Sequence, residues 1–192
     1  ERQLGGRDGA LAHDVVGHTS HGIGHQARER RVARAHGGGC VSQHQEGRAV
    51  AGSRFRGRQI VLNFIFTRCP IATMCPAATE RMAALQKAAQ AAGAKNFELV
   101  SISLDPEYDT LGVLKDYAQL RGLDTSNWSF LTGPDAAVRH LLAQLGVIRE
   151  FEGATIKHTL ATVLINEEGK IAYRVDGSTW PVEDFVRRLR KD

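Results

Sequence analysis

The sequence predicts an α/β fold in which helices flank a central mixed sheet, with a poorly ordered extension ahead of it. Three observations favour this class. Strand-like apolar runs alternate with helix-like segments from residue 54 onward. The first run, residues 60–66 (IVLNFIF), is almost continuously apolar, which is typical of a strand buried on both faces. The last segments indicate a hairpin of two alternating strands and a short amphipathic helix.

Turn and cap residues mark where the predicted elements begin and end. A helix over residues 76–92 begins with Pro76, which suits a first helical turn, and Gly93 follows its end. A strand is expected over residues 97–105, and the apolar spacing of residues 110–122 predicts a helix. The remaining predicted elements are a strand at 128–133, a helix over 134–146, a loop, a hairpin over 161–177 with its turn at 166–169, and a helix over 180–192.

The resulting order of elements is β, α, β, α, β, α, β, β, α. Strands that alternate with helices imply a largely parallel sheet covered on both faces, because each crossover returns over the sheet. A final antiparallel hairpin followed by a helix is the ending of a thioredoxin-like fold. Functional residues of open α/β sheets collect beyond the carboxyl ends of the strands, where the loops at residues 67–75 and 105–110 are expected.

Residues 1–53 differ in composition from the rest of the chain. They hold six of the eight histidines and eleven of the twenty glycines, but no lysine and no aromatic residue. No stretch keeps an apolar period of 2 or 3.6, and the glycine-rich runs would interrupt any element. We therefore divide the chain into a disordered or non-native extension, residues 1–53, and one globular domain, residues 54–192. Cys40, in the extension, is interpreted as incidental.

Charge and cysteine content argue against several classes of protein. The formal net charge of +4 is spread over both parts of the chain, so it gives no support to nucleic-acid binding. Three cysteines do not suggest a small secreted domain held by disulfides. No run reaches the roughly 18–20 apolar residues that a membrane helix needs. We expect membrane association only through an anchor outside this sequence.

Two cysteines lie in the loop between the first strand and the first helix, in the stretch TRCPIATMCP. Cys69 follows the strand, and Cys75 stands where the helix dipole favours a thiolate, with Arg68 as a nearby positive charge. A redox pair, a metal pair and two semi-buried thiols all remain open. Thioredoxin-type motifs need Cys-x-x-Cys, but Ala72 is the third residue after Cys69. Peroxiredoxins place a threonine three residues before the attacking cysteine. Counted from Cys75, that position is Ala72, and Thr73 is one residue too close.

A metal pair would need a third ligand. Two thiolates in a flexible loop can bind a soft ion such as Cu(I), which accepts sulfur together with one imidazole. The loop ahead of the hairpin approaches the cysteine loop in a thioredoxin-like topology, so His158 is the best candidate, whereas His140 lies mid-helix. Asp105, at the end of the neighbouring strand, could orient a ligand or shift the proton affinity of a thiol. Asp109 and Thr110 fit the cap of the next helix.

Four segments, in this order and spacing, resemble the Sco/SenC family: FIFTRCPIATMCP, SISLDPEYDT, WSFLTG and KHTLATVLINEEGKIAYRVDG. Members of this family are thioredoxin-fold copper chaperones that help to assemble the copper centre of cytochrome c oxidase. The resemblance runs from about residue 54 to residue 192, and it implies that Cys69, Cys75 and His158 bind copper. The usual family motif is Cys-x3-Cys, whereas this chain has Cys-x5-Cys.

The resemblance implies a metallochaperone rather than an enzyme, located in the cell envelope and facing the periplasm. Its cargo would be a copper ion, and its partners a copper-receiving subunit of cytochrome c oxidase and a thiol reductant, with no nucleic acid. The alternative is a thiol-disulfide oxidoreductase, or a peroxiredoxin-like protein, that uses Cys69 and Cys75 without metal. Replacing His158 separates the two, because only the copper site would need its imidazole.

Overall fold

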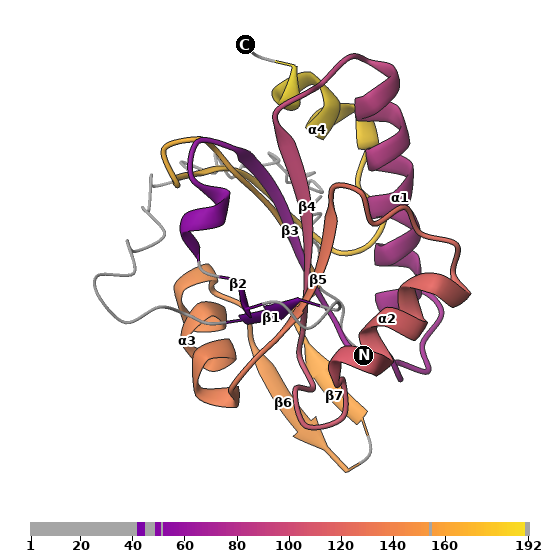
Figure 1. The fold of residues 1–192 in the computed structure, drawn as a ribbon. Coiled ribbons are helices and arrows are strands. Elements are labelled where there is room, and N and C mark those ends of the chain that lie inside the picture. Colours follow the sequence, from indigo (N-terminus) through magenta and orange to yellow (C-terminus); the bar gives the residue numbers. More distant parts are fainter. Residues whose placement is uncertain (1–41, 45–48, 51, 154, 191–192) are drawn as a thin grey trace, which may run out of the picture.

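A seven-stranded mixed sheet runs through the middle of the molecule (Figure 1), in the order β2-β1-β5-β4-β3-β8-β9. The computed structural model describes residues 42–44, 49–50, 52–153 and 155–190. The strands of this sheet are β1 (Ser42–His44), β2 (Ala49–Val50), β3 (Gln59–Ile65), β4 (Phe97–Ser103), β5 (Trp128–Thr132), β8 (Ala161–Ile165) and β9 (Ile171–Asp176). A separate hairpin is formed by β6 (Arg149–Glu152) and β7 (Thr155–His158).

Helices cover both faces of the sheet (Figure 1). They are the 3-10 helix η1 (Gly52–Phe55), α1 (Cys75–Ala91), α2 (Leu111–Leu120), α3 (Asp135–Leu145) and α4 (Val182–Leu189). α1, α2 and α4 lie on one side and α3 on the other. Because β3, β4 and β5 are parallel neighbours, the connections after β3 and β4 emerge at the same edge of the sheet. The predicted thioredoxin-like arrangement, with the antiparallel β8 and β9 beside β3, is confirmed.

The three parallel strands form the centre of the core. All residues of β4 and β5 are buried, and so is all of β3 except Gln59. A line of buried polar groups crosses the three strands, since Trp128 Nε1 donates to Ser101 Oγ at 3.0 Å and Ser101 Oγ donates to Asn63 Oδ1 at 2.6 Å. Directional hydrogen bonds inside an apolar layer favour one register, because any slip would leave these groups unpaired.

Most of the predicted elements are present with small shifts at their ends. The first helix begins at Cys75, one residue earlier than expected, so this cysteine belongs to the helix itself. The helix predicted to end at Gly146 does so, and this residue adopts the left-handed conformation (φ 63°) that favours glycine after a helix. The hairpin turn at residues 166–169 is also confirmed, with Gly169 N–H donating to Asn166 O.

Two regions differ from the prediction. The loop expected between the third helix and the final hairpin contains β6 and β7, two short strands of which only Ile156 and His158 are buried. Such strands lack the apolar alternation that would reveal them. β1 and β2 precede residue 54, and β1 extends the sheet by antiparallel pairing with β5. The sheet therefore begins before the predicted domain boundary, because backbone pairing rather than an apolar pattern specifies β1. Residues 1–41, with Cys40, lie outside the described residues.

No helix in the described part of the chain combines the length and the apolar character needed to span a bilayer.

Candidate functional site

The two cysteines occupy the connection that leaves the carboxyl end of β3. Cys75 is the first residue of α1 and its side chain is fully buried, whereas Cys69 lies in the preceding loop and is partly exposed. The loop turns twice, with the Cys69 N–H donating to Phe66 O at 3.3 Å and the Met74 N–H donating to Ile71 O at 3.0 Å. Both thiols are free, and one is open to reagents from solution while the other is not.

His158 reaches Cys75 from the end of β7. Its Nε2 lies 3.4 Å from Cys75 Sγ, and its Nδ1 lies 3.2 Å from the carbonyl oxygen of Thr159. A carbonyl only accepts hydrogen bonds, so Nδ1 carries the proton and the Nε2 lone pair faces the thiol. Phe66 packs edge-on against the imidazole, with 5.8 Å between ring centres. The contact predicted between the cysteine loop and His158 is therefore present for Cys75.

Burial keeps both partners of this contact neutral. It raises the pKa of the Cys75 thiol strongly, and the neighbouring Cys69 thiol and the Asp109 carboxylate add to the rise. Burial also lowers the pKa of His158. The expectation that the helix start would favour a Cys75 thiolate is wrong for the metal-free protein, because desolvation of a fully buried sulfur outweighs the helix dipole.

Asp109 is the buried carboxylate of the site. Its carboxylate accepts hydrogen bonds from Thr67 N–H at 3.2 Å, Thr67 Oγ1 at 2.5 Å and Ser103 Oγ at 2.6 Å. It therefore ties the first residues of the cysteine loop to the end of β4. The sequence assigned Asp109 to a helix cap, but only Thr110 caps α2, by accepting from the Val113 N–H. The spacing of DPEYDT fitted a cap equally well, so the sequence held no signal for this role.

Arg68 and Asp105, which the sequence suggested as residues supporting the thiols, pair with each other. Arg68 Nε donates to Asp105 Oδ2 at 2.7 Å, and the guanidinium also lies over the Tyr108 ring at 4.6 Å. The charge that could have stabilised a thiolate is thus balanced by a neighbouring carboxylate. The ion pair instead forms a second link between the cysteine loop and the loop after β4.

Arg149 anchors the hairpin that carries His158. It lies opposite His158 in the β6–β7 pairing, and its guanidinium donates to Leu104 O at 3.0 Å and to Asp135 Oδ1 at 2.6 Å. The Arg149 side chain is only 5% exposed. The hairpin is thereby fixed to the end of β4 and the start of α3. Sequence analysis missed Arg149 because it predicted a loop here.

Exposed apolar side chains surround the site. Large hydrophobic residues that are at least 47% exposed occur on all three segments that build it: Ile71 in the cysteine loop, Tyr108 after β4, and Ile148 and Phe151 at the hairpin. The only other residue of this kind in the described part of the chain is Leu120, on α2. We call Ile71, Tyr108, Ile148 and Phe151 the apolar rim. Large exposed apolar side chains are common at protein contact surfaces.

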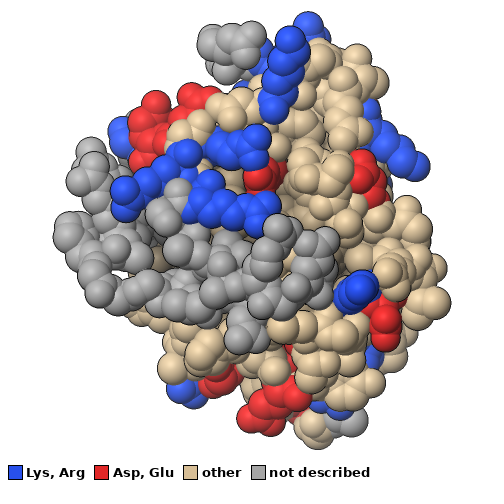
Figure 2. Space-filling model, in the orientation of Figure 1, with Lys and Arg blue, Asp and Glu red and all other residues tan. Residues whose placement is uncertain are grey.

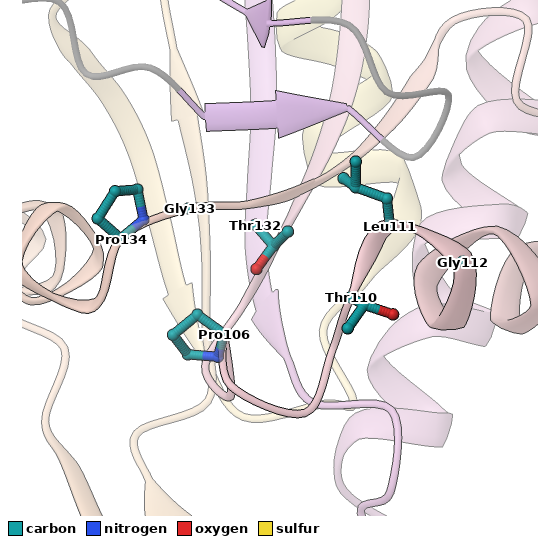
Figure 3. A pocket seen from close by; sticks show the side chains of 7 residues that line it. All are labelled: Pro106, Thr110, Leu111, Gly112, Thr132, Gly133 and Pro134. Carbon is teal, nitrogen blue, oxygen red and sulfur yellow. The ribbon is translucent and has the colours of Figure 1, made fainter.

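A cavity of about 670 Å³ lies beside the site, between the loop after β4 and the loop after β5 (Figure 3). It is lined by Pro106, Thr110, Leu111, Gly112, Thr132, Gly133 and Pro134. None of these side chains is a thiol or an imidazole, so Cys69, Cys75 and His158 do not line this cavity.

The three expected copper ligands are not gathered into one cluster. Cys75 and His158 are in contact, but no set of three His, Cys, Asp or Glu side chains in the described residues is arranged to hold a metal ion. The donor set itself fits a soft ion, because two sulfurs and a nitrogen lone pair are available. Cys69 lies in a loop of mainly exposed residues, and its thiol interacts with that of Cys75.

Comparisons with known proteins point to one family. The sequence model of the SCO1/SenC family matches residues 30–191. The chain is 30% identical over 156 residues to the SCO1 protein homolog of Bacillus subtilis (strain 168), covering 77% of this chain and 78% of that protein.

Three solved structures show the same fold. The crystal structure of a SCO1/SenC family lipoprotein from Bacillus anthracis has a TM-score of 0.73 at 29% identity, over 78% of this chain and 90% of that one. BsSco is a member of the Sco family of cytochrome c oxidase assembly proteins, and a disulfide switch was identified in it. Its structure has a TM-score of 0.69 at 29% sequence identity, over 78% of this chain and 88% of that one. The structure of copper-bound ScoI of Arabidopsis thaliana has a TM-score of 0.69 at 22% sequence identity, over 81% of this chain and 98% of that one. This is a likeness of fold alone.

The difference in burial between the thiols predicts a difference in reactivity. We expect iodoacetamide near pH 7 to modify Cys69 at least about tenfold faster than Cys75, because the thiolate fraction falls tenfold for each unit of rise in thiol pKa. Mass spectrometry of the two peptides during the reaction measures both rates. In urea the two cysteines should react alike. Equal rates in the folded protein would contradict the buried position of Cys75.

The burial of Asp109 predicts a pH dependence of stability. Its pKa is raised by burial, so the folded protein keeps the proton to higher pH than the unfolded chain does. The stabilisation from that proton is complete below the unfolded pKa and is lost as pH rises through the folded pKa. We expect the free energy of unfolding of Asp109→Asn, relative to wild type, to rise as the pH increases above about 4, the ordinary aspartate pKa.

Urea unfolding across this pH range measures the effect, and Asp116→Asn, an exposed carboxylate on α2, controls for the loss of one charge. A constant difference between Asp109→Asn and wild type would show that Asp109 does not titrate in this range.

Proposed function

The chain belongs to the SCO1/SenC family, and we propose that it is a copper-binding metallochaperone that delivers copper to the copper centre of cytochrome c oxidase during assembly. The observation that carries the proposal is the contact of Cys75 with the unprotonated Nε2 of His158, beside a second, more exposed thiol. Solved members of this fold hold copper, and one belongs to a family of oxidase assembly proteins.

Copper is the cargo of this protein, and Cys69, Cys75 and His158 are its proposed ligands. Cys75 and His158 are already in contact, and the Cys69 thiol interacts with that of Cys75. The raised pKa of Cys75 means that copper must displace a proton from this sulfur. Affinity should therefore increase with pH. Cu(I) suits the site better than a hard ion, because thiolates and imidazole are soft or borderline ligands.

Release of copper follows from the unequal exposure of the thiols. A thiolate of the receiving subunit can approach the partly exposed Cys69 but not the buried Cys75. Exchange at Cys69 comes first, and the Cys75 and His158 bonds break once the acceptor holds the ion. Oxidation of the two thiols to a disulfide would prevent binding, and a thiol reductant would then be needed to restore both sulfurs.

The acceptor is proposed to dock on the apolar rim. Copper(I) transfer by ligand exchange needs the two proteins in contact, because each new Cu–S bond forms before an old one breaks. The apolar rim offers exposed hydrophobic area on every segment around Cys69. Its aromatic members lie against arginines, with Arg149 5.0 Å from the Phe151 ring centre, which holds the rings in place.

We propose a location in the cell envelope with the site facing the periplasm. The SCO1/SenC relative from Bacillus anthracis is a lipoprotein, which is an envelope protein held at a membrane.

A thiol-disulfide oxidoreductase is the second candidate. The arrangement of one accessible and one buried thiol, each free, suits a pair in which Cys69 attacks a partner's disulfide and Cys75 resolves the mixed disulfide. A disulfide switch in the relative BsSco is consistent with such chemistry. This reaction does not need the Nε2 lone pair of His158 as a metal ligand.

Anaerobic titration with Cu(I) against a competing chelator tests the copper proposal. We expect one tightly held ion, with affinity reduced at least about 100-fold in Cys69→Ser, Cys75→Ser and His158→Ala, because loss of a ligand costs more than the 10–100-fold loss seen for residues behind the ligands. His140→Ala removes an exposed histidine of α3 and is the matched control. Full affinity in His158→Ala would contradict the proposal and favour the oxidoreductase.

Transfer of copper to a purified copper-receiving oxidase subunit tests the apolar rim. We expect Tyr108→Ser/Phe151→Ser to slow transfer about tenfold or more, because truncating an aromatic interface residue commonly costs over 1 kcal/mol. Its Cu(I) affinity should not change. Leu120→Ser, which removes the exposed hydrophobic residue outside the apolar rim, should transfer copper at the wild-type rate. Equal effects of both changes would show that docking occurs elsewhere.

A further inference from the structure

A second surface, at the opposite end of the sheet from the cysteines, is strongly basic. Lys and Arg gather in the upper part of the face shown in Figure 2, with acidic residues mainly at the edge of the group. The basic residues that precede β3 and β4 or end α4 are Arg54, Arg56, Arg58, Lys95, Arg188 and Arg190. We call these six residues the basic pole. The seven residues of β3 separate it from the cysteine loop by roughly 20 Å.

Ion pairs and hydrogen bonds join the segments of the basic pole into one surface. Arg54 and Arg58 both pair with Glu98, whose side chain is 5% exposed. Arg58 also donates to Asn96 Oδ1 at 3.4 Å, and Asn96 donates to Gly57 O at 2.8 Å. These bonds hold the start of β3 against the start of β4.

The end of α4 is attached to the same surface. Gln59 Nε2 donates to the carbonyl oxygen of Arg188 at 3.3 Å, and the Arg188 guanidinium lies 3.8 Å from the Tyr173 ring centre. The segments that carry the basic pole are therefore joined to one another, and Arg54, Arg58 and Arg188 are held by contacts within it.

The charge of the basic pole is only partly balanced. Glu98 forms ion pairs within it, and Glu167 borders it through a hydrogen bond from Asn96. Six cations against these two carboxylates leave a clear positive excess. The Arg54 and Arg58 side chains remain 40% and 41% exposed although they pair with Glu98, so part of each guanidinium still faces solvent.

We propose that the basic pole binds the phosphate headgroups of an anionic lipid surface and thereby turns the cysteine site away from the membrane. Guanidinium groups match phosphate oxygens in pairs, and each Lys or Arg near an anionic bilayer adds attraction that salt screens. None of the exposed large hydrophobic residues in the described part of the chain belongs to this surface, which favours contact with headgroups rather than insertion.

A lipid surface explains this chemistry better than nucleic acid does. Single-stranded nucleic acid is held by stacking on exposed aromatic rings. The Tyr173 ring is partly buried, and the Arg188 guanidinium already covers it. The relative from Bacillus anthracis is a lipoprotein, which keeps a domain of this kind near a bilayer. The proposal rests on the proposed envelope location, but it does not depend on copper binding.

Vesicle co-sedimentation of the full chain tests the proposal. Binding to vesicles that contain phosphatidylglycerol is compared with binding to vesicles of phosphatidylcholine alone, at low salt and at about 1 M salt, where charges are screened within about 3 Å. The test variant is Arg56→Glu/Lys95→Glu/Arg190→Glu, which leaves the Arg54 and Arg58 pairs with Glu98 intact. The control, Arg81→Glu/Lys87→Glu/Lys115→Glu, makes the same change of net charge on α1 and α2.

We expect wild type and control to bind anionic vesicles at low salt, and the test variant to bind roughly 100-fold more weakly. All three should keep the same Cu(I) affinity and urea midpoint, which separates failure here from failure of the copper proposal. If the test and control variants lost the same affinity for anionic vesicles, binding would depend on net charge alone, and the proposal would be overturned. The proposal would also be overturned if the test variant kept its binding to anionic vesicles, or if the wild type did not bind them. Tighter binding of the wild type to a DNA duplex than to vesicles would overturn it as well.

Discussion

A buried carboxylate links the two connections on which the site depends. β3 and β4 are parallel neighbours, so the loops that follow them leave the same edge of the sheet. Asp109, on the second loop, accepts three hydrogen bonds from Thr67 and one from Ser103, which fixes where the first loop starts. Burying an ionisable group is costly unless such donors surround it. The cysteine loop can therefore leave Cys69 exposed, because its two ends are held by Asp109 and by α1.

The rest of the site is built by a second attachment, from the hairpin side. Arg149 fixes β6 to the end of β4, and the β6–β7 pairing then places His158 against Cys75. The result is a buried pair in contact, Cys75 and His158, and a third, more exposed thiol, Cys69. Under the proposed function this division would be useful, because the more exposed ligand could exchange while the buried pair keeps the ion in place. Fixed ligands on all sides would bind more tightly and release more slowly.

The sequence predicted the parts of this structure that are specified by apolar patterns. The buried runs of β3 and β4, the helices with proline and glycine at their ends, and the final hairpin all carry such patterns. The β6–β7 hairpin does not, because only Ile156 and His158 are buried, and β1 is specified by backbone pairing. The site shows the same limit. His158 was found through topology, whereas the pairing of Arg68 with Asp105 and the burial of Asp109 depend on side-chain directions that spacing alone does not determine.

The long spacing between the two cysteines is compatible with this division of the site. The residues between them, Pro70 to Thr73, are exposed, and only Met74 is partly buried before Cys75 enters the helix. Added length therefore lies on the solvent side of the loop, and the contact of Cys75 with His158 does not depend on it. Ser178 Oγ donates to Thr73 O at 2.7 Å, which holds the loop beside the helix start. Because closure entropy grows only slowly with loop length, a loop of this length costs little more than a shorter one, and under the proposed function it would leave Cys69 accessible to an ion or a partner's sulfur.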